Sequence, residues 1–156
     1  MTSESPDLPA LPPALYFACD HAGYPLKVAL QDYLRERYGE AAALQDLGTH
    51  GTDAVDYPDF GHVAATRVRD HPGSLGVITC GSGVGISIAA NRVAGARAAL
   101  CHTPELAQLA REHNDANILA LGARIISEMQ ARACLLRFLA TPFAGGRHQA
   151  RVAKLG

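Results

Sequence analysis

The stretch Val77-Ile78-Thr79-Cys80-Gly81-Ser82-Gly83-Val84-Gly85-Ile86-Ser87 carries the strongest structural signal in the chain. Its short β-branched run predicts a strand that ends at Cys80, and the three glycines that follow predict a loop. The residues from Ile86 to Asn91 are typical of a helix start. A strand, a glycine loop and a helix in this order favour binding of an anion at the loop. Glycines let the backbone approach a ligand, and a helix N-terminus attracts negative charge.

The thiol at the entrance of this loop makes Cys80 a candidate base. Helix N-termini stabilise thiolates, and neighbouring backbone N–H groups stabilise a developing oxyanion. A buried structural cysteine beside a loop without a ligand is the alternative at this point. No Lys-Ser or Lys-Thr follows, so the loop is not a Walker A loop, and Ile86 stands where the dinucleotide fingerprint needs its third glycine.

Composition bounds the class of protein and its partners. The 156 residues fit one domain, and 48% hydrophobic with 19% charged residues is typical of a globular protein. A formal net charge of -1 gives no reason to expect nucleic acid or an acidic membrane as a partner. No window approaches ~18 uninterrupted apolar residues, so we expect no membrane span.

The N-terminus and the cysteines indicate a cytoplasmic location. Residues 1–14 form a polar, Pro-rich stretch without the features of a signal peptide, and we predict a disordered extension there. The four cysteines form no C-x-x-C pair, so we expect reduced thiols, with Cys101 and Cys134 as small buried side chains. The scattered His and Cys residues show no metal-ligand spacing, so no metal is predicted.

Hydrophobic patterning predicts an α/β fold with five parallel strands. The predicted strands are Leu15–Cys19, Ala42–Leu47, Leu75–Thr79, Ala96–Cys101 and Ile118–Leu121. Helical spacing separates them, and Pro25, Pro58 and Pro104 suit first-turn positions of helices. This alternation predicts βαβ units, in which ligands bind beyond the carboxyl ends of the strands.

Several polar residues have two readings on local grounds. Asp20 would either accept a hydrogen bond from a sugar hydroxyl or cap a helix. His21 would either donate a hydrogen bond to a phosphate or be a solvated loop residue. His113 is a functional group or a partner of a helix C-terminus. Arg147 and Arg151 would share one face of a short C-terminal helix, where they would hold a phosphate or form a solvated basic tail.

Taken in order, six motifs resemble the sugar-phosphate isomerase family that includes ribose-5-phosphate isomerase B and the galactose-6-phosphate isomerase subunits. The matching segments span Leu15 to Val152: Cys19-Asp20-His21-Ala22-Gly23 with Leu26-Lys27, Asp46-Leu47-Gly48-Thr49, Asp56-Tyr57-Pro58, the stretch from Cys80 to Asn91, His113-Asn114-Asp115-Ala116-Asn117, and Gly145-Gly146-Arg147-His148.

The resemblance implies a Rossmann-like three-layer sandwich, with residues 15–156 as one domain that ends in a helical tail. It implies an aldose–ketose isomerase that interconverts D-ribose 5-phosphate and D-ribulose 5-phosphate through an enediolate. It further implies no cofactor, no metal, and a homodimer or tetramer whose active sites are shared between subunits. A small-molecule sugar phosphate would be the ligand.

The resemblance also assigns roles to individual residues. Cys80 would be the base, with Ser82 beside it, and His113 would help to open the sugar ring. The backbone N–H groups of Gly81, Ser82, Gly83, Val84 and Gly85 would stabilise the enediolate; Asp20, Tyr57 and Asn114 would hold the sugar; and His21, Arg124, Arg147 and Arg151 would hold the phosphate.

Two features bear on the choice within the family. One branch uses a glutamate base at the position of Ile86, and an isoleucine cannot serve, so the base would be Cys80. The Gly145-Gly146-Arg147-His148 tail favours a pentose phosphate. The alternatives are an isomerase of a six-carbon sugar phosphate, such as allose 6-phosphate or galactose 6-phosphate, and a non-catalytic phosphosugar-binding domain.

Overall fold

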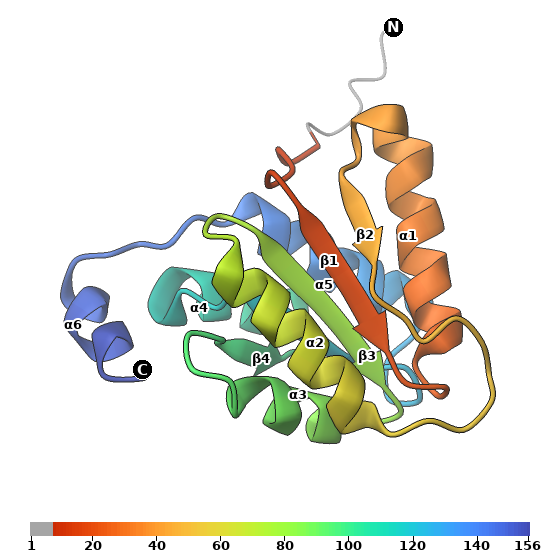
Figure 1. Ribbon diagram of the computed structural model, residues 1–156. Coiled ribbons are helices and arrows are strands. Elements are labelled where there is room, and N and C mark those ends of the chain that lie inside the picture. The colour runs from red at the N-terminus through yellow and green to blue at the C-terminus, as the bar shows by residue number, and fades with distance from the viewer. Residues whose placement is uncertain (1–7) are drawn as a thin grey trace, which may run out of the picture.

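A five-stranded parallel sheet forms the centre of the computed structural model, which describes residues 8–156 (Figure 1). The strands are β1 (Leu15–Cys19), β2 (Leu44–Asp46), β3 (Leu75–Cys80), β4 (Ala98–Leu100) and β5 (Ile118–Gly122), in the spatial order β2-β1-β3-β5-β4. The helices are α1 (Tyr24–Tyr38), the 3-10 helix η1 (Gly39–Ala41), α2 (Tyr57–Asp70), α3 (Val84–Asn91), α4 (Pro104–Asn114), α5 (Glu128–Ala140) and α6 (Arg147–Ala153). The predicted α/β class and the five parallel strands are confirmed.

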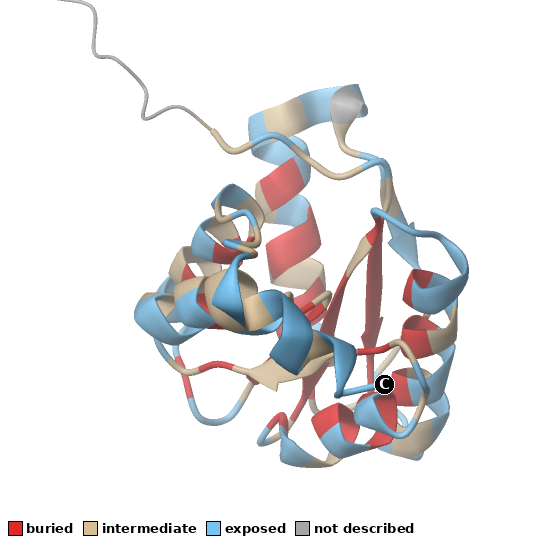
Figure 2. Cartoon of the chain, turned by 90° about the vertical axis from the view of Figure 1, so that its left-hand side faces the viewer, coloured by how far each residue is buried: buried red, intermediate tan, exposed pale blue. Residues whose placement is uncertain are grey.

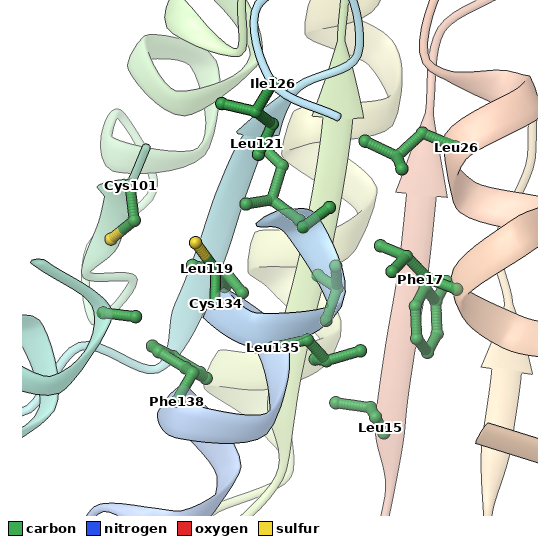
Figure 3. Close-up of a cluster of buried hydrophobic side chains, with 14 of the residues drawn as sticks. Leu15, Phe17, Leu26, Cys101, Leu119, Leu121, Ile126, Cys134, Leu135 and Phe138 are labelled. Atoms are coloured by element: carbon green, nitrogen blue, oxygen red, sulfur yellow. The ribbon is translucent and has the colours of Figure 1, made fainter. Parts of the chain in front are cut away.

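Side chains alternate between the two faces of the sheet and build a core on each. Phe17 and Leu119 pack with buried residues of α1, α4 and α5, and Figure 3 shows this cluster around Leu135. Ile78 on β3 packs on the opposite side, against α2 and α3. The result is three layers, with the sheet between two helical layers. Because both faces are covered, β1, β3 and β5 read as continuous apolar runs.

Two strands are shorter than predicted because neighbouring backbone is used elsewhere. The predicted strand Ala42–Leu47 is reduced to β2, since η1 precedes it and Gly48 N–H turns back to the Asp46 carboxylate. The predicted strand Ala96–Cys101 is reduced to β4, since Arg97 N–H donates to the side chain of Asn117. Both are the edge strands of the sheet.

The outer edge of β4 is covered by a side chain from α3. The Asn91 amide donates to the Ala98 carbonyl at 2.9 Å and its oxygen accepts the Ala98 N–H at 2.7 Å. A primary amide thus occupies the place where a further strand would pair.

The described residues before β1 and the C-terminal helix α6 lie outside the three layers. The predicted disorder of residues 1–14 falls partly on residues 1–7, which are outside the described residues, and the domain boundary at residue 14 stays a prediction. Within the described part, Pro9 accepts a hydrogen bond from the Tyr38 hydroxyl of α1. At the other end, α6 has no buried residue and stands away from the sheet beside α4 (Figures 1 and 2).

Candidate active site

Three neighbouring strand ends bring predicted site residues together at the carboxyl edge of the sheet. The parallel register pairs Cys19 with Thr79, and Cys80 with Gly122. Asp20, which follows Cys19, therefore lies beside Cys80, and Arg124 follows from β5. Residues brought together in this way come from segments far apart in the sequence, as expected at the ligand-binding edge of an open α/β sheet.

Cys80 ends β3 with a buried side chain, and its sulfur accepts the N–H of Gly83 at 3.1 Å. The other three cysteines have a different setting. Burial raises the pKa of Cys19 to about 11 and that of Cys101 to about 12, and burial also raises the pKa of Cys134. These three thiols stay protonated at neutral pH. Cys80 is the cysteine that lies at the glycine loop, where its sulfur contacts the Gly83 N–H.

The turn from the glycine loop into α3 requires a left-handed backbone conformation at Gly83. Gly83 caps α3 with φ of 78°, and a β-carbon there would lie 2.5 Å from Leu100 Cδ1 and 2.9 Å from the Leu121 carbonyl carbon. Two of the five expected N–H donors are already engaged, since Gly83 donates to Cys80 and Val84 donates to Ser82 Oγ. The N–H groups of Gly81, Ser82 and Gly85 have no hydrogen-bond acceptor among the described residues.

Two further predicted residues border the loop. A β-carbon on Gly85 would lie 2.7 Å from the Tyr57 ring, so this half-exposed ring covers the loop at the start of α3. A β-carbon on Gly81 would lie 3.4 Å from a terminal nitrogen of Arg124, whose own N–H donates to the Gly81 carbonyl. The structure therefore brings an aromatic ring and a guanidinium to opposite ends of the glycine loop.

Asp20 and His21 are held by local hydrogen bonds. Asp20 Oδ1 accepts the N–H of Gly23 at 2.9 Å in the turn before α1, so one carboxylate oxygen is engaged. The N-cap residue of α1 is Gly23, so Asp20 is not the helix cap. His21 Nδ1 accepts the N–H of Val55 at 3.1 Å. The neutral imidazole therefore carries its proton on Nε2, which makes that nitrogen the donor.

The remaining predicted residues form a second group. The His113 ring stacks on the His148 ring of α6, with centroids 4.3 Å apart and planes 17° apart. Asn114, Arg147 and Arg151 line a cavity of about 370 Å³ with these two histidines. Desolvation lowers the pKa of His148, and the neighbouring charges of His113, Arg147 and Arg151 lower it further.

The two groups lie at opposite edges of the sheet within one chain. His113 and Asn114 end α4 and precede β5, so they lie at its amino edge, whereas Cys80 lies at the carboxyl edge of the parallel strand β3. Six residues of β3 separate the two edges by roughly 16 Å. One chain therefore does not bring His113, Asn114, Arg147 and Arg151 to Cys80.

Lys27 and Asp46 have no predicted role, and hydropathy predicts that a lysine is exposed. The Lys27 side chain is instead fully buried and pairs with Asp46 at 2.6 Å. The pair holds the segment that leads to Val55 and Tyr57. Helical spacing could have found it, because Lys27 falls next to Leu26 and one turn before Leu30 on the buried side of α1.

Replacing Gly83 with alanine should destabilise the protein and abolish its activity. A β-carbon meets Leu100 and the backbone at Leu121, and a left-handed conformation costs a non-glycine residue about 1–3 kcal/mol before that clash. Thermal unfolding and turnover measure both effects. The control is Gly81→Ala, whose nearest neighbour would be 3.4 Å away. Equal melting temperatures for the two variants would contradict the assignment.

None of the helices in residues 8–156 combines the length and apolar character that a membrane crossing needs. The same residues contain no group of three or more His, Cys, Asp or Glu side chains placed to hold one metal ion.

A parallel α/β sheet with a thiol, a glycine loop, a histidine and an arginine at its carboxyl edge defines a Rossmann-like α/β protein. A family model for ribose/galactose isomerases matches residues 15–155. The ribose-5-phosphate isomerase B of Escherichia coli K12 is 43% identical over 136 residues, 87% of this chain and 89% of the relative.

Solved structures agree with this match. The ribose-5-phosphate isomerase B of Clostridium thermocellum has a TM-score of 0.87 and 45% identity, covering 92% of this chain and 95% of that chain. The Mycoplasma genitalium enzyme of the same name, with bound ribulose 5-phosphate, has a TM-score of 0.85 and 38% identity, covering 91% and 93%. The chain belongs to the ribose/galactose isomerase family, and it is an enzyme of the aldose–ketose isomerase class.

Proposed function

We propose that this enzyme interconverts D-ribose 5-phosphate and D-ribulose 5-phosphate, with Cys80 as the base. The observation that carries the proposal is the placement of the Cys80 sulfur against the Gly83 N–H at the mouth of the glycine loop. The relatives named above support the substrate, since they carry the name ribose-5-phosphate isomerase B, and one holds ribulose 5-phosphate.

The reaction moves one proton from C2 to C1 and a second proton from the C2 oxygen to the C1 oxygen. The Cys80 thiolate removes the proton from C2 of the open-chain aldose, and negative charge develops on the C1 oxygen. The proton of the C2 hydroxyl then moves to the C1 oxygen, and the Cys80 thiol returns its proton to C1, which leaves the carbonyl at C2 and regenerates the thiolate. The N–H groups of Gly81, Ser82 and Gly85, which have no acceptor among the described residues, would stabilise that oxyanion. A base and positioned donors suffice for this proton transfer, which changes no overall oxidation state.

Each remaining residue has a role in binding or ring opening. Asp20, through its second carboxylate oxygen, and Tyr57, beside the loop, would hold sugar hydroxyls. His21 Nε2–H and the Arg124 guanidinium would bind the phosphate. His113 would protonate the ring oxygen as the furanose opens, and Asn114 would orient the sugar.

A complete site then requires two copies of the chain. His113, Asn114, Arg147 and Arg151 lie at the edge of the sheet opposite Cys80, so they would serve the Cys80 site of a partner subunit. Exposed apolar side chains near the Cys80 loop and near the C-terminal helix support such an association. Ile88 on α3 is 59% exposed, and Leu155 after α6 is 62% exposed. We propose a homo-oligomer with shared active sites.

Arg147→Ala and Arg151→Ala should each weaken substrate binding about ten- to more than a hundredfold. Charge-assisted hydrogen bonds to a phosphate contribute roughly 1.5–3 kcal/mol apiece where a partner excludes water. The dissociation constants of ribose 5-phosphate and of inorganic phosphate measure the effect. Arg132→Ala is the control, because Arg132 pairs with Glu128 on α5, away from both groups. Unchanged affinity in both tail variants would remove the tail from the site.

Turnover by the purified protein in the presence of a chelator tests the reaction itself. Ribose 5-phosphate should be converted with a higher kcat/KM than allose 6-phosphate or galactose 6-phosphate. A preference for a six-carbon sugar phosphate would replace the pentose substrate. Binding without turnover of any of these would indicate a phosphosugar-binding domain.

A further inference from the structure

Lys27 carries a buried charge that the reaction does not use. Its side chain has 0% exposure on α1, and its ammonium donates to Asp46 Oδ1 and to the Thr49 carbonyl, both at 2.6 Å. The third side of the ammonium faces the Tyr24 ring at 5.6 Å. Burial of an ammonium costs several kcal/mol unless it is fully paired, so its partners are held firmly in place.

The partners of Lys27 belong to one short segment, residues 46–49, which is bonded to the end of β1. Asp46 Oδ1 also accepts the Gly48 N–H at 2.9 Å. Thr49 N–H donates to the Cys19 carbonyl, and Cys19 N–H donates to the Gly48 carbonyl. Burial alone would raise the pKa of Asp46, but the hydrogen bonds from Lys27 and Gly48 outweigh it and lower that pKa, so the carboxylate stays charged.

The segment continues without regular structure into the active site. Residues 50–56 form no helix or strand, and within them the Val55 N–H reaches His21 Nδ1. The next element begins with Tyr57, whose ring covers Gly85. The ends of this irregular stretch are therefore the Lys27 anchor on one side and α2 on the other.

We propose that Lys27 is a positioning residue for the sugar-phosphate site. Its ammonium fixes the Asp46–Thr49 segment, and that segment sets where residues 50–57 place the Val55 N–H and the Tyr57 ring. The Val55 N–H, positioned by this segment, keeps the His21 proton on Nε2, where it would face the phosphate. This inference rests on the proposed function for the identity of the ligand, and not for the hydrogen bond to His21.

Lys27→Met tests the proposal because it keeps the length of the side chain and removes the ammonium. KM for ribose 5-phosphate should rise on the order of 10- to 100-fold, since small displacements of binding groups have effects of this size. The kcat value should fall less, because Cys80 and its loop are held by β3 and α3. The imidazole ¹⁵N signals of His21 should lose the pattern of a fixed Nε2–H tautomer, while those of His113 stay unchanged.

Two further variants separate positioning from stability. Leu34→Ala, two turns further along α1 in the core, should lower the melting temperature and leave KM unchanged. The double variant Lys27→Met/Asp46→Leu replaces the ion pair by apolar groups, which often restores stability. Its melting temperature should exceed that of Lys27→Met, while KM stays raised because the Thr49 carbonyl still lacks the Lys27 ammonium and keeps only the long contact from the Cys19 thiol at 3.7 Å.

The proposal is overturned if Lys27→Met keeps both the wild-type KM and the wild-type His21 signals. It is equally overturned if KM recovers with stability in the double variant, or if Leu34→Ala raises KM as much. If the wild-type protein does not convert ribose 5-phosphate, the proposed function fails. The His21 signals then still decide the role of Lys27, because they need no substrate.

Discussion

Cys80→Ser should lower kcat for ribose 5-phosphate by roughly 10²–10⁴-fold, the contribution of a positioned base. A serine hydroxyl is a far weaker base near neutral pH, and it is close enough in size to keep the Gly83 N–H bonded. The affinity for inorganic phosphate should therefore stay close to that of the wild type. Initial rates in both directions and phosphate binding measure the two quantities on one preparation.

The matched control is Cys101→Ser, which makes the same exchange at a thiol buried between the sheet and α5. We expect it to lose some stability and keep its activity. Substantial turnover by Cys80→Ser would show that another group removes the proton. Loss of activity in both variants, with unchanged folding, would show that the exchange of sulfur for oxygen acts through the structure and not through the base.

Mixing inactive Cys80→Ser subunits with weakened Arg151→Ala subunits should restore activity. In a hybrid dimer, one of the two sites combines the intact Cys80 of one chain with the intact Arg151 of the other. Random exchange makes half of the dimers hybrids, so about one quarter of the wild-type activity is expected for a symmetric dimer. The assay uses substrate below the KM of the Arg151→Ala variant.

The control for this experiment is a mixture of Cys80→Ser with Lys27→Met/Cys80→Ser, in which no hybrid has an intact thiol. Mass spectrometry of the intact complexes confirms that subunits have exchanged. Exchange without recovered turnover would mean that each chain builds its own site, and that α6 must move from its position beside α4 to reach Cys80.

The fold could be predicted well because its signals are local. Apolar runs mark β1, β3 and β5, and prolines lie in the first turn of α1, α2 and α4. The edge strands were predicted too long, since nothing in the composition of residues 96–101 shows that Arg97 N–H bonds to Asn117. Strand ends depend on such long-range hydrogen bonds, which a local pattern does not contain.

The site could be predicted in part, because the strand ends gather Asp20, His21, Cys80 and Arg124 once the sheet is parallel. The same topology places His113 at the other edge, and this supports the shared site that the resemblance implies. The bonds of the Gly83 and Val84 N–H groups depend on loop geometry, and the pairing of Lys27 with Asp46 depends on tertiary contact, so neither was predicted.

The hydrogen bonds between the Asn91 amide of α3 and Ala98 of β4 affect how copies of this chain can associate. An uncovered edge strand is a template on which another chain adds a strand, and this leads to fibrous aggregates. Asn91 occupies both outward-facing groups of Ala98, and at the other side of the sheet β2 has only three residues. Strand addition is therefore disfavoured at both margins of the sheet, so the homo-oligomer proposed above would form through helical surfaces and not by extension of the sheet.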